Sequence, residues 1–547
     1  MRPVILTLSL LLLVTPAAGQ ESTTYSRADT LRGAWDSHGR SWWDVVAYDL
    51  EVSVRPQDST IAGRNRIDYR VTAPGQELQI DLMAPLQLDS ITQQGTSLRF
   101  RRDGDAYFVT PAIAPLPGAV QSLTVYYQGR PRTASRPPWD GGFTWQADSL
   151  GRPWVVTTDQ GIGASVWWPN KDTQADEPDS QRVAVTVPAP LIHVGNGRLR
   201  NTTRNPDGTI TYEWFVASPI NNYAIAVNAG SYVHWSEVYQ GEGGELTLDF
   251  WPLDYHEAAA RRQWAEVHPM LQCFEHWFGP YPWYEDGFKL IEVPYNGMEH
   301  QSAVTYGNGF ANGYRGRDLS GTGLGMKWDF IIIHEAAHEW FANHITVKDQ
   351  ADMWVHESFA NYAEGLYTEC RFGREAGAAY TVGSRLGIEN DMPIIPAYGV
   401  NARGSGDMYP KGGNMLHTIR QIVADDEKWR DILRGLNHTF GRQTVTGQQI
   451  EQYISAQAGI DLGRVFDQYL RDVRIPVLEY GLDGRTLTYR WSNVVPGFDM
   501  PVRIALEPGG DRLLQPTESW QSLELDAVPA QISVDPNFYV TTARRPE

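Results

Sequence analysis

Residues 331–338 of this 547-residue chain, Ile-Ile-Ile-His-Glu-Ala-Ala-His, decide which fold the sequence can adopt. Apolar flanks and small alanine fillers are typical of a buried helix. Positions four apart share one face of a helix, so the imidazoles of His334 and His338 can reach one metal ion. Glu335 would then border the open coordination position, where water binds. The pattern alone leaves a second interpretation, in which two unrelated core histidines flank a surface glutamate.

A third metal ligand is expected, because catalytic zinc usually takes three protein ligands and keeps a fourth position open. Residues 353–362 have apolar positions at helical spacing and contain both His356 and Glu357. Neighbouring helix positions point about 100° apart, so only one of the two can face the site. We take Glu357 as the third ligand, although spacing alone leaves His356 as a rival.

Three further ionisable residues lie close to these segments. Glu339 is a rival to Glu335 as the base, but it sits one step off the face that carries the two histidines. His344 is expected to be structural. Glu364 follows Glu357 by seven residues on the same helix face. We expect Glu364 to be solvated by default, with support of a ligand as the alternative.

These segments resemble the aminopeptidase N family of gluzincin zinc peptidases, which includes leukotriene hydrolase. The resemblance rests on the His-Glu-x-x-His motif, eighteen intervening residues, and Glu357 within the segment Trp-Val-His-Glu-Ser-Phe-Ala at 354–360. This match to the family's zinc signature favours Glu357 over His356. It implies one Zn²⁺ per chain, held by His334, His338 and Glu357, with Glu335 as the general base.

An upstream segment resembles the family's exopeptidase motif, Gly-x-Met-Glu-Asn. Residues 296–300 read Asn-Gly-Met-Glu-His. The resemblance implies that Glu299 binds the free amino terminus of a substrate and that Gly297 and Met298 line the substrate site. Asn296 and His300 depart from the motif, so the loop shape and the specificity stay open. A surface acid is the alternative reading of Glu299.

Two more residues take their expected roles from the same resemblance. Residues 409–412, Tyr-Pro-Lys-Gly, are similar to the family's Tyr-x-Lys-Gly segment, which implies that Tyr409 hydrogen-bonds the oxyanion. Gln160, nine residues before Pro169, looks like the family's amine-anchoring Glu or Gln. A packed phenol and a turn amide are the alternative readings of Tyr409 and Gln160.

The chain changes character twice along its length. Alternating apolar residues predict strands from about residue 42 to 254, for example at Tyr48, Leu50, Val52 and Val54. Helical patterns dominate from 255 to about 473, with a helix over 255–278 interrupted near Pro269 and a strand at 288–293. Strands return beyond residue 476.

We therefore predict a multidomain α+β protein. The predicted parts are a signal peptide (1–19), an N-terminal β domain (20–254), a zinc peptidase domain (255–475) and a C-terminal β-sandwich (476–547). The family resemblance implies a saddle-like antiparallel N-terminal domain and a thermolysin-like, mostly helical catalytic domain. It also implies a three-domain form without the family's C-terminal helical domain.

Composition limits the partners and the compartment. A net charge of −19 argues against nucleic acid as a partner, because phosphate binding needs a basic face. A short basic start, an apolar run at 4–14 and small residues at 16–19 predict a cleaved secretory signal and no stable membrane anchor. The protein is expected to be secreted or periplasmic. Cys273 and Cys370, the chain's two cysteines, fit a disulfide or two buried thiols equally well.

The leading hypothesis is a secreted zinc aminopeptidase that removes residues from peptides with a free amino terminus. The first alternative is a thermolysin-type endopeptidase, which shares the zinc chemistry and lacks an amine clamp. The second alternative is a non-catalytic scaffold of the same fold. The sequence leaves open the preferred first residue, the physiological substrate and the oligomeric state.

Overall fold

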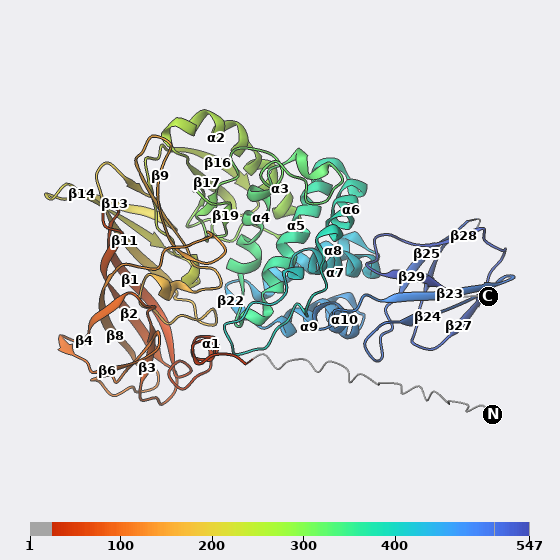
Figure 1. Ribbon diagram of the computed structural model, residues 1–547, viewed down its shortest axis with the longest axis horizontal. Coiled ribbons are helices and arrows are strands. Elements are labelled where there is room, and N and C mark those ends of the chain that lie inside the picture. The colour runs from red at the N-terminus through yellow and green to blue at the C-terminus, as the bar shows by residue number, and fades with distance from the viewer. Residues whose placement is uncertain (1–23, 508, 546–547) are drawn as a thin grey trace, which may run out of the picture.

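Three regions follow one another along the longest axis of the protein in a computed structural model (Figure 1). The structure describes residues 24–507 and 509–545. Strands dominate the first region, helices the second and strands again the third, which confirms the predicted multidomain α+β fold. The predicted signal peptide at 1–19 lies outside the described residues.

The N-terminal region is built from three sheets. The largest has the strand order β13-β14-β11-β1-β2-β8-β4-β5. Its strands are β1 (Trp43–Arg55), β2 (Thr60–Val71), β4 (Gln87–Gln93), β5 (Thr96–Ser97), β8 (Val120–Gly129), β11 (Ser180–Pro188), β13 (Arg198–Arg204) and β14 (Thr209–Val216). A three-stranded sheet contains β3 (Leu78–Asp81), β6 (Phe100–Asp103) and β7 (Ala106–Val109). A four-stranded sheet contains β9 (Gly142–Ala147), β10 (Pro153–Thr158), β12 (Ile192–His193) and β15 (Asn228–Gly230).

In the large sheet, burial alternates along β1 as the sequence predicts, but one pair of strands differs from the predicted antiparallel arrangement. Tyr48, Leu50, Val52 and Val54 of β1 are all buried, and their neighbours are more exposed. This alternation is what a sheet with one packed face requires. The sheet is not wholly antiparallel, because β1 and β11 pair in parallel. A pairing of strands so far apart in sequence leaves no local pattern from which it could be predicted.

A five-stranded sheet lies between the N-terminal region and the helices. Its order is β16-β17-β18-β20-β19, and its strands are β16 (Trp235–Gly241), β17 (Gly244–Trp251), β18 (Phe288–Glu292), β19 (Gly297–Met298) and β20 (Val304–Tyr306). Ile291 and Met298 join the N-terminal core, while Leu290 and Val304 join the core of the helical region. The sheet crosses the predicted division at 254/255, because β17 pairs in parallel with β18.

Ten α-helices occur among the described residues, and nine of them follow this sheet or interrupt it. They are α1 (Arg27–Gly33), α2 (Glu257–Gln263), α3 (Val267–Phe278), α4 (Phe330–Ala337), α5 (Trp354–Phe372), α6 (Arg374–Gly383), α7 (Pro410–Val423), α8 (Asp426–Phe440), α9 (Gly447–Ala458) and α10 (Gly463–Leu470). Short strands β21 (Ile345–Val347) and β22 (Gln443–Val445) pair in parallel among them. None of the helices in the described part of the chain has the length and apolar character needed to cross a bilayer.

The predicted break near Pro269 lies elsewhere. The chain departs from the α-helix at a 3₁₀ turn over Trp264–Glu266, and α3 begins at Val267. Pro269 is the third residue of α3. The first N–H groups of a helix have no acceptor within it, so a proline there removes no hydrogen bond.

A disulfide joins Cys273 of α3 to Cys370 of α5. The sequence left this pairing and two buried thiols equally open, and the structure has the bridge. The bond connects two helices of the core, and α5 is the helix that carries Glu357 and Glu364.

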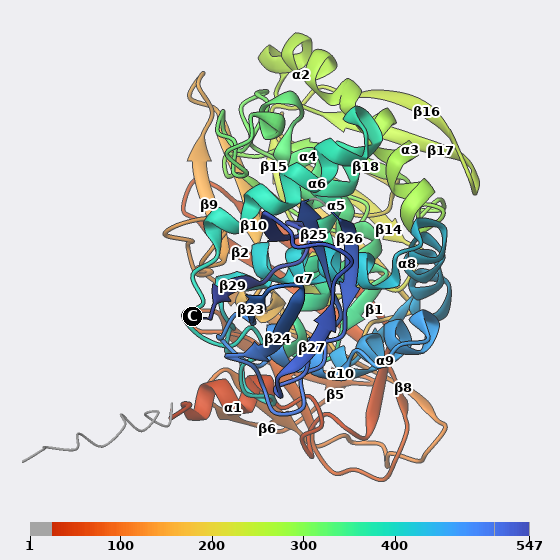
Figure 2. The ribbon, with the colours of Figure 1, turned by 90° about the vertical axis from the view of Figure 1, so that its right-hand side faces the viewer.

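Two packed sheets form the C-terminal region, in front of the helices in Figure 2. One contains β23 (Val477–Asp483), β24 (Thr486–Ser492), β27 (Gln521–Glu524) and β29 (Thr541–Arg544); the other contains β25 (Val502–Glu507), β26 (Gly510–Leu514) and β28 (Gln531–Val534). Their apolar residues continue the core of the helical region as far as Phe538. The C-terminal strands are therefore packed against the helices.

Candidate active site

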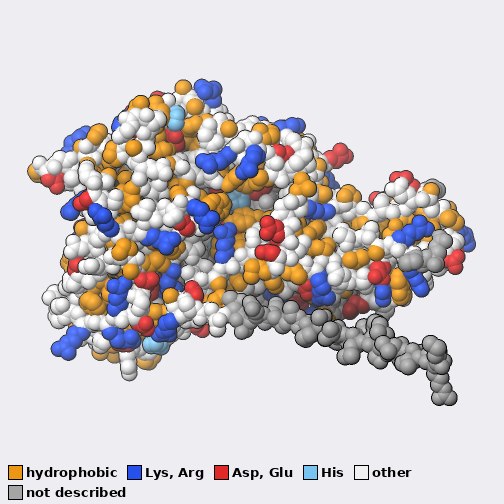
Figure 3. All heavy atoms as spheres, in the orientation of Figure 1, with side chains coloured by type: hydrophobic (Ala, Val, Ile, Leu, Met, Phe, Trp, Pro, Cys, Tyr) orange, Lys and Arg blue, Asp and Glu red, His pale blue; other side chains and the backbone are white. Residues whose placement is uncertain are grey.

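A cavity of about 540 Å³ opens where the N-terminal region meets the helices. Its walls come from the loop at 138–140, the turn at 160–162, the edge strand β19, helices α4 and α5, and the loop at 401–410. Figure 3 shows a hollow near the middle of this face, with histidine and hydrophobic side chains at its floor. The cavity thus collects side chains from segments separated by hundreds of residues.

Helix α4 carries the His-Glu-x-x-His motif into this cavity. Its N-cap is Asp329, whose carboxylate accepts a hydrogen bond from the Ile331 amide and stabilises the first turn. The helix ends at Ala337, so His338 stands at the C-cap with helical φ and ψ. Both imidazoles therefore keep the same-face geometry that the spacing predicts.

The end of α4 supplies a hydrogen-bond partner for His338. Phe341 and Ala342 leave helical geometry, with φ of −129° and 143°. The Phe341 carbonyl accepts a hydrogen bond from Nδ1 of His338 at 3.0 Å. A carbonyl can only accept, so this contact places the proton of the imidazole on Nδ1 and leaves the Nε2 lone pair free.

The structure brings His334, His338 and Glu357 together as one buried group. One ligand atom from each lies within 4.8 Å of the other two. Oε2 of Glu357 is 3.6 Å from Nε2 of His334 and 3.4 Å from Nε2 of His338. This oxygen is buried and accepts no hydrogen bond from the described residues. Two imidazole nitrogens and an orphaned carboxylate oxygen that converge in this way fit a catalytic zinc site.

Glu364 corrects a prediction from the sequence. It is 1% exposed rather than solvated, and its Oε1 lies 2.8 Å from Nδ1 of His334. The Tyr380 hydroxyl donates to Oε2 at 2.7 Å. Burial is tolerated because both carboxylate oxygens have partners. Glu364 therefore sets the tautomer and orientation of His334, as carboxylates behind metal-binding histidines do. Its seven-residue distance from Glu357 was the signal for this role.

The rival residues lie away from the metal-binding group. Nε2 of His356 accepts a hydrogen bond from the Val347 amide at 3.0 Å, and burial lowers the pKa of His356 to about 3. Glu339 is fully buried and accepts from the Ser302 amide at 2.8 Å. His344 contacts Asn437, as expected of a structural residue. Each of these three side chains supports the fold beside the site.

Glu335 faces the cavity from α4. Its side chain is 8% exposed, and burial raises its pKa to about 7. Gly297 of β19 packs against it, because a Cβ at position 297 would lie 2.5 Å from Cγ2 of Ile331 and 3.1 Å from Cγ of Glu335. Only glycine allows the edge strand to approach the helix so closely. Met298, the next residue of β19, also lines the cavity.

Glu299 and Gln160 meet although 139 residues separate them in sequence. Nε2 of Gln160 donates to Oε1 of Glu299 at 2.6 Å and to Oε1 of Glu357 at 3.1 Å. The Tyr223 hydroxyl donates to Oε1 of Glu299 at 3.3 Å. Glu299 is 2% exposed. These contacts create an acidic end of the cavity beside the metal-binding group. Sequence reasoning missed Tyr223, which supports Glu299 from outside the lining of the cavity.

Tyr409 lines the same cavity beside the metal-binding group. Its ring centre lies 5.9 Å from the ring of His334. Nη2 of Arg403 donates to the Tyr409 hydroxyl at 2.9 Å. Tyr409 precedes α7, whose first residue is Pro410, so it lies at the helix N-cap and outside helical geometry. No spacing rule linked Arg403 to this site from sequence.

Comparisons with known proteins find relatives among peptidases and zinc metallopeptidases. The peptidase family M1 domain matches residues 264–469. The chain is 29% identical over 200 residues to aminopeptidase N of Lactobacillus helveticus, covering 33% of this chain and 22% of that protein. It is 25% identical over 400 residues to human aminopeptidase B, covering 69% of this chain and 55% of that protein. The chain thus spans about half or less of these curated relatives.

The fold is similar to that of an M1 zinc metallopeptidase from Deinococcus radiodurans, solved as a mutant bound to a Tyr-Ser-Ala substrate. The TM-score is 0.68 at 22% identity, over 81% of this chain and 97% of the other. At this identity the likeness establishes the fold. The matched family domain includes α4, α5 and Tyr409, whereas Gln160 lies before it.

Proposed function

This chain belongs to the aminopeptidase N family of gluzincin peptidases through its M1 domain, and from that premise we propose that it is a zinc-dependent aminopeptidase. The substrates would be peptides with a free amino terminus. The observation that carries the proposal is the contact of Glu299 and Gln160 beside His334, His338 and Glu357. An acid next to a metal-binding group selects a cationic chain end for hydrolysis.

His334, His338 and Glu357 would hold one zinc ion. Bound there, zinc would supply a Lewis acid that acidifies water and polarises a carbonyl group. Glu364 holds the first imidazole in the tautomer that a metal needs, and the Phe341 carbonyl does the same for His338.

Glu335 is the proposed general base. Its carboxylate borders the cavity and accepts a proton from the attacking water, then delivers that proton to the nitrogen of the leaving amine. Burial raises its pKa to about 7, which suits an acid that must both take and return a proton near neutral pH.

Tyr409 is the proposed oxyanion donor. Its ring lies beside that of His334, 5.9 Å between centres, and its hydroxyl would donate to the carbonyl oxygen as negative charge develops. Loss of one such donor typically costs about 3–4 kcal/mol of activation free energy.

Glu299 and Gln160 are the proposed clamp for the α-ammonium group, and Gly297 and Met298 form the adjoining wall. A fixed negative charge at one end of the cavity places only the first peptide bond beside Glu335. A thermolysin-type endopeptidase would lack this restriction, and a non-catalytic scaffold would lack turnover.

A pair of peptides tests the proposal. The purified protein should release the first residue of a free pentapeptide and act at least about 100-fold more slowly on its N-acetylated form, a difference of roughly 2.7 kcal/mol. Chelation should abolish the activity and one equivalent of Zn²⁺ should restore it. Equal rates on both peptides would establish the endopeptidase, and activity without metal would overturn the mechanism.

We also propose that the protein acts outside the cytoplasm, in a secreted or periplasmic location. Two observations support this. The basic start, apolar run and small residues of 1–19 are typical of a secretory signal. The Cys273–Cys370 bridge is the kind of bond that persists in oxidising compartments. Fractionation of cells that express the full chain, with sequencing of the mature amino terminus, tests the location.

A further inference from the structure

Arg403 is the only lysine or arginine among the described residues that line the active-site cavity. The guanidinium donates from Nη2 to the Tyr409 hydroxyl at 2.9 Å, and Cζ lies 5.9 Å from the centre of the Tyr409 ring. Arg403 forms no ion pair with a carboxylate in the part of the chain that the structure describes. Its only hydrogen-bonded protein partner there is Tyr409.

The direction of this hydrogen bond has a chemical consequence. A guanidinium has five N–H donors and no acceptor, so the Tyr409 oxygen must accept. The hydroxyl proton of Tyr409 then points to another acceptor. The metal-binding group lies beside Tyr409: the ring of His334 is 5.9 Å away between centres, and burial, together with the charge of Glu357, raises the pKa of Tyr409. A charged donor also polarises the hydroxyl, which makes its own hydrogen bond stronger.

We propose that Arg403 is a positioning residue for Tyr409. It directs the Tyr409 proton toward the carbonyl oxygen of the substrate and strengthens the hydrogen bond that forms as charge develops there. This inference rests on the proposed function, in which Tyr409 stabilises the oxyanion. It adds a member to the site that lies outside every motif in the sequence.

The loop that carries Arg403 is held on one side by the segment just before α5. The Gly399 amide donates to Oδ2 of Asp349 at 2.8 Å, and the Tyr398 hydroxyl donates to Oδ1 of Asp352 at 2.7 Å. Because α5 carries Glu357, the same segment positions the third metal ligand and the loop of Arg403. The distance between the two is therefore set by fixed contacts.

Helix α1 holds the other side of the loop. The Asn401 amide donates to the Asp29 carbonyl at 3.0 Å. A Cβ at Gly33 would lie 2.3 Å from the carbonyl carbon of Val400, so the end of α1 packs directly on the loop backbone. These two contacts flank the residues that immediately precede Arg403, which limits the positions the guanidinium can take.

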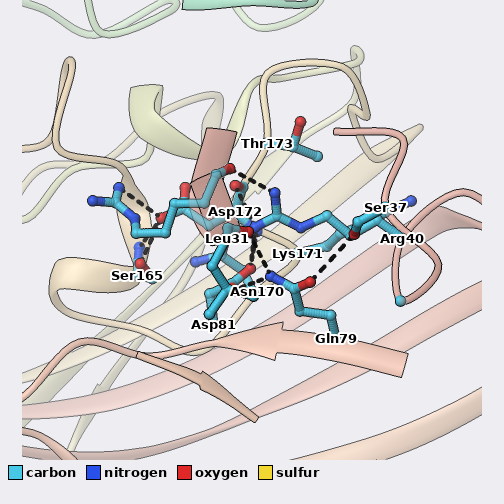
Figure 4. A network of polar contacts seen from close by, with 12 residues as sticks. Leu31, Ser37, Arg40, Gln79, Asp81, Ser165, Asn170, Lys171, Asp172 and Thr173 are labelled. Atoms are coloured by element: carbon cyan, nitrogen blue, oxygen red, sulfur yellow. Dashed lines mark hydrogen bonds and ion pairs between the residues drawn. The ribbon is translucent and has the colours of Figure 1, made fainter. Parts of the chain in front are cut away.

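A buried ion pair attaches α1 to the N-terminal sheets (Figure 4). Nη1 of Arg40 donates to the Arg32 carbonyl at 2.7 Å, and Nη2 donates to Oδ2 of Asp81 at 2.6 Å and to the Asp172 carbonyl at 3.0 Å. Arg40 and Asp81 are completely buried. A charge buried with this many partners holds its neighbours in one geometry, so the support of Arg403 extends to the N-terminal region.

An exposed arginine in a peptide site has a second chemical use, which is to bind the terminal carboxylate of a short substrate. The bond to Tyr409 favours the positioning role, because a carboxylate anchor needs no contact with the oxyanion donor. The two roles differ in what they affect. Positioning acts on kcat whatever the far end of the peptide carries, whereas anchoring acts on KM only for peptides that end in a carboxylate.

A double-mutant cycle tests the inference with the holoenzyme and two tripeptides, one a free acid and one a C-terminal amide. Arg403→Met should lower kcat by about tenfold on both, since it weakens one oxyanion donor, with KM changed less than threefold. In a Tyr409→Phe background, Arg403→Met should lower kcat by less than twofold, because its target hydroxyl is gone. Arg403→Lys should recover part of the loss, and Arg464→Met, on α10, is the matched control.

The opposite results would overturn the inference. An equal tenfold loss in both backgrounds would show that Arg403 acts without Tyr409. A loss confined to KM of the free acid would assign Arg403 to carboxylate binding. In that case calorimetry in a Glu335→Gln background should show that Arg403→Met weakens binding of the free acid and leaves binding of the amide unchanged. Thermal unfolding of each variant checks that it is folded. If Arg403→Met does not fold, the kinetics of Arg403→Lys in the two backgrounds test the inference in its place. A wild-type protein that cleaves neither peptide would contradict the proposed function instead.

Discussion

Oε1 of Glu364 lies 2.8 Å from Nδ1 of His334, so one helix supplies both a metal-binding carboxylate and the acid that orients a metal-binding imidazole. Glu357 and Glu364 are two turns apart on α5 and share its inner face. The remaining oxygen of Glu364 accepts from the Tyr380 hydroxyl at 2.7 Å. The metal-binding group therefore has a buried support on α5 and α6.

Replacing Glu364 with glutamine should weaken zinc binding by about 10- to 100-fold. The amide keeps the volume but lacks the charge that holds the proton of His334 on Nδ1. Competition with a chelator of known affinity measures the change. Glu375→Gln, an exposed acid on α6, is the control. Unchanged zinc affinity in Glu364→Gln would show that Glu364 serves only to fill space.

Glu335→Gln should bind one equivalent of zinc and lose about 1,000-fold in kcat, because a buried general base is removed while the ligands stay in place. Metal analysis and initial rates measured on the same sample separate the two effects. A variant that keeps near-normal turnover would remove Glu335 from the mechanism. Loss of the metal would place Glu335 among the groups that hold it.

Glu299→Gln should reduce the preference for free over N-acetylated peptides by about 100-fold, since the α-ammonium group loses its fixed counter-charge, a difference of roughly 2.7 kcal/mol. The amide retains the size of the side chain and keeps Gln160 and Tyr223 close. The ratio of kcat/KM for the two peptides is the measurement. An unchanged ratio would mean that another group binds the amino terminus.

Replacing Cys273 and Cys370 with alanine should lower the free energy of unfolding by about 2–4 kcal/mol, because the bridge restrains a long segment of the unfolded chain. Urea unfolding with and without reductant measures this. Reductant should destabilise the wild type and leave the double variant unchanged. If reductant, added when the chain is unfolded and accessible, does not change the free energy of unfolding of the wild type, the bridge is absent.

Acidification should destabilise the protein through His300. Burial lowers the pKa of His300 from 6.5 to about 3, and neither ring nitrogen has a hydrogen-bond partner among the described residues. The unfolded chain binds a proton near pH 6.5, and the folded chain does not until about pH 3. The contribution of His300 to the free energy of unfolding is fully present above pH 6.5 and is smaller by about 2 kcal/mol at pH 5.

His300→Asn should therefore flatten the dependence of unfolding free energy on pH between 5 and 7, as measured by urea unfolding at each pH. His438→Asn, at an exposed position of α8, is the control that should keep the wild-type slope. The same slope in His300→Asn and in the wild type would show that His300 is protonated in the folded protein.

The sequence predicted those parts of the site that depend on local geometry. His334 and His338 lie on one helix face because four residues make about one turn, and a helix keeps that relation wherever it is packed. Alternating apolar residues predicted β1 for the same kind of reason. The family resemblance added the residues of three short motifs, and the structure brings Glu299, Gln160 and Tyr409 around the metal-binding group.

Other features were beyond the reach of local patterns. The spacing of Glu364 from Glu357 places both on one face of α5, but it does not show that Glu364 is buried; the packing of α6 against α5 buries it under Tyr380. Arg403 belongs to no motif. The sheet that crosses residue 254 pairs β17 with β18 in parallel, and the pattern of apolar residues in either strand does not predict this pairing.

By itself, the amino-acid sequence determined that His334 and His338 share one helix face and in what order the β and α regions follow, because both depend on contacts within a few residues of one helix or strand. The choice of Glu357 over His356 as the third ligand came from the family resemblance. Tertiary structure decided which acid orients His334, which cation meets Tyr409 and where the sheets divide. Those relationships depend on how distant segments pack, since burial and the closing of long loops determine which polar groups become neighbours.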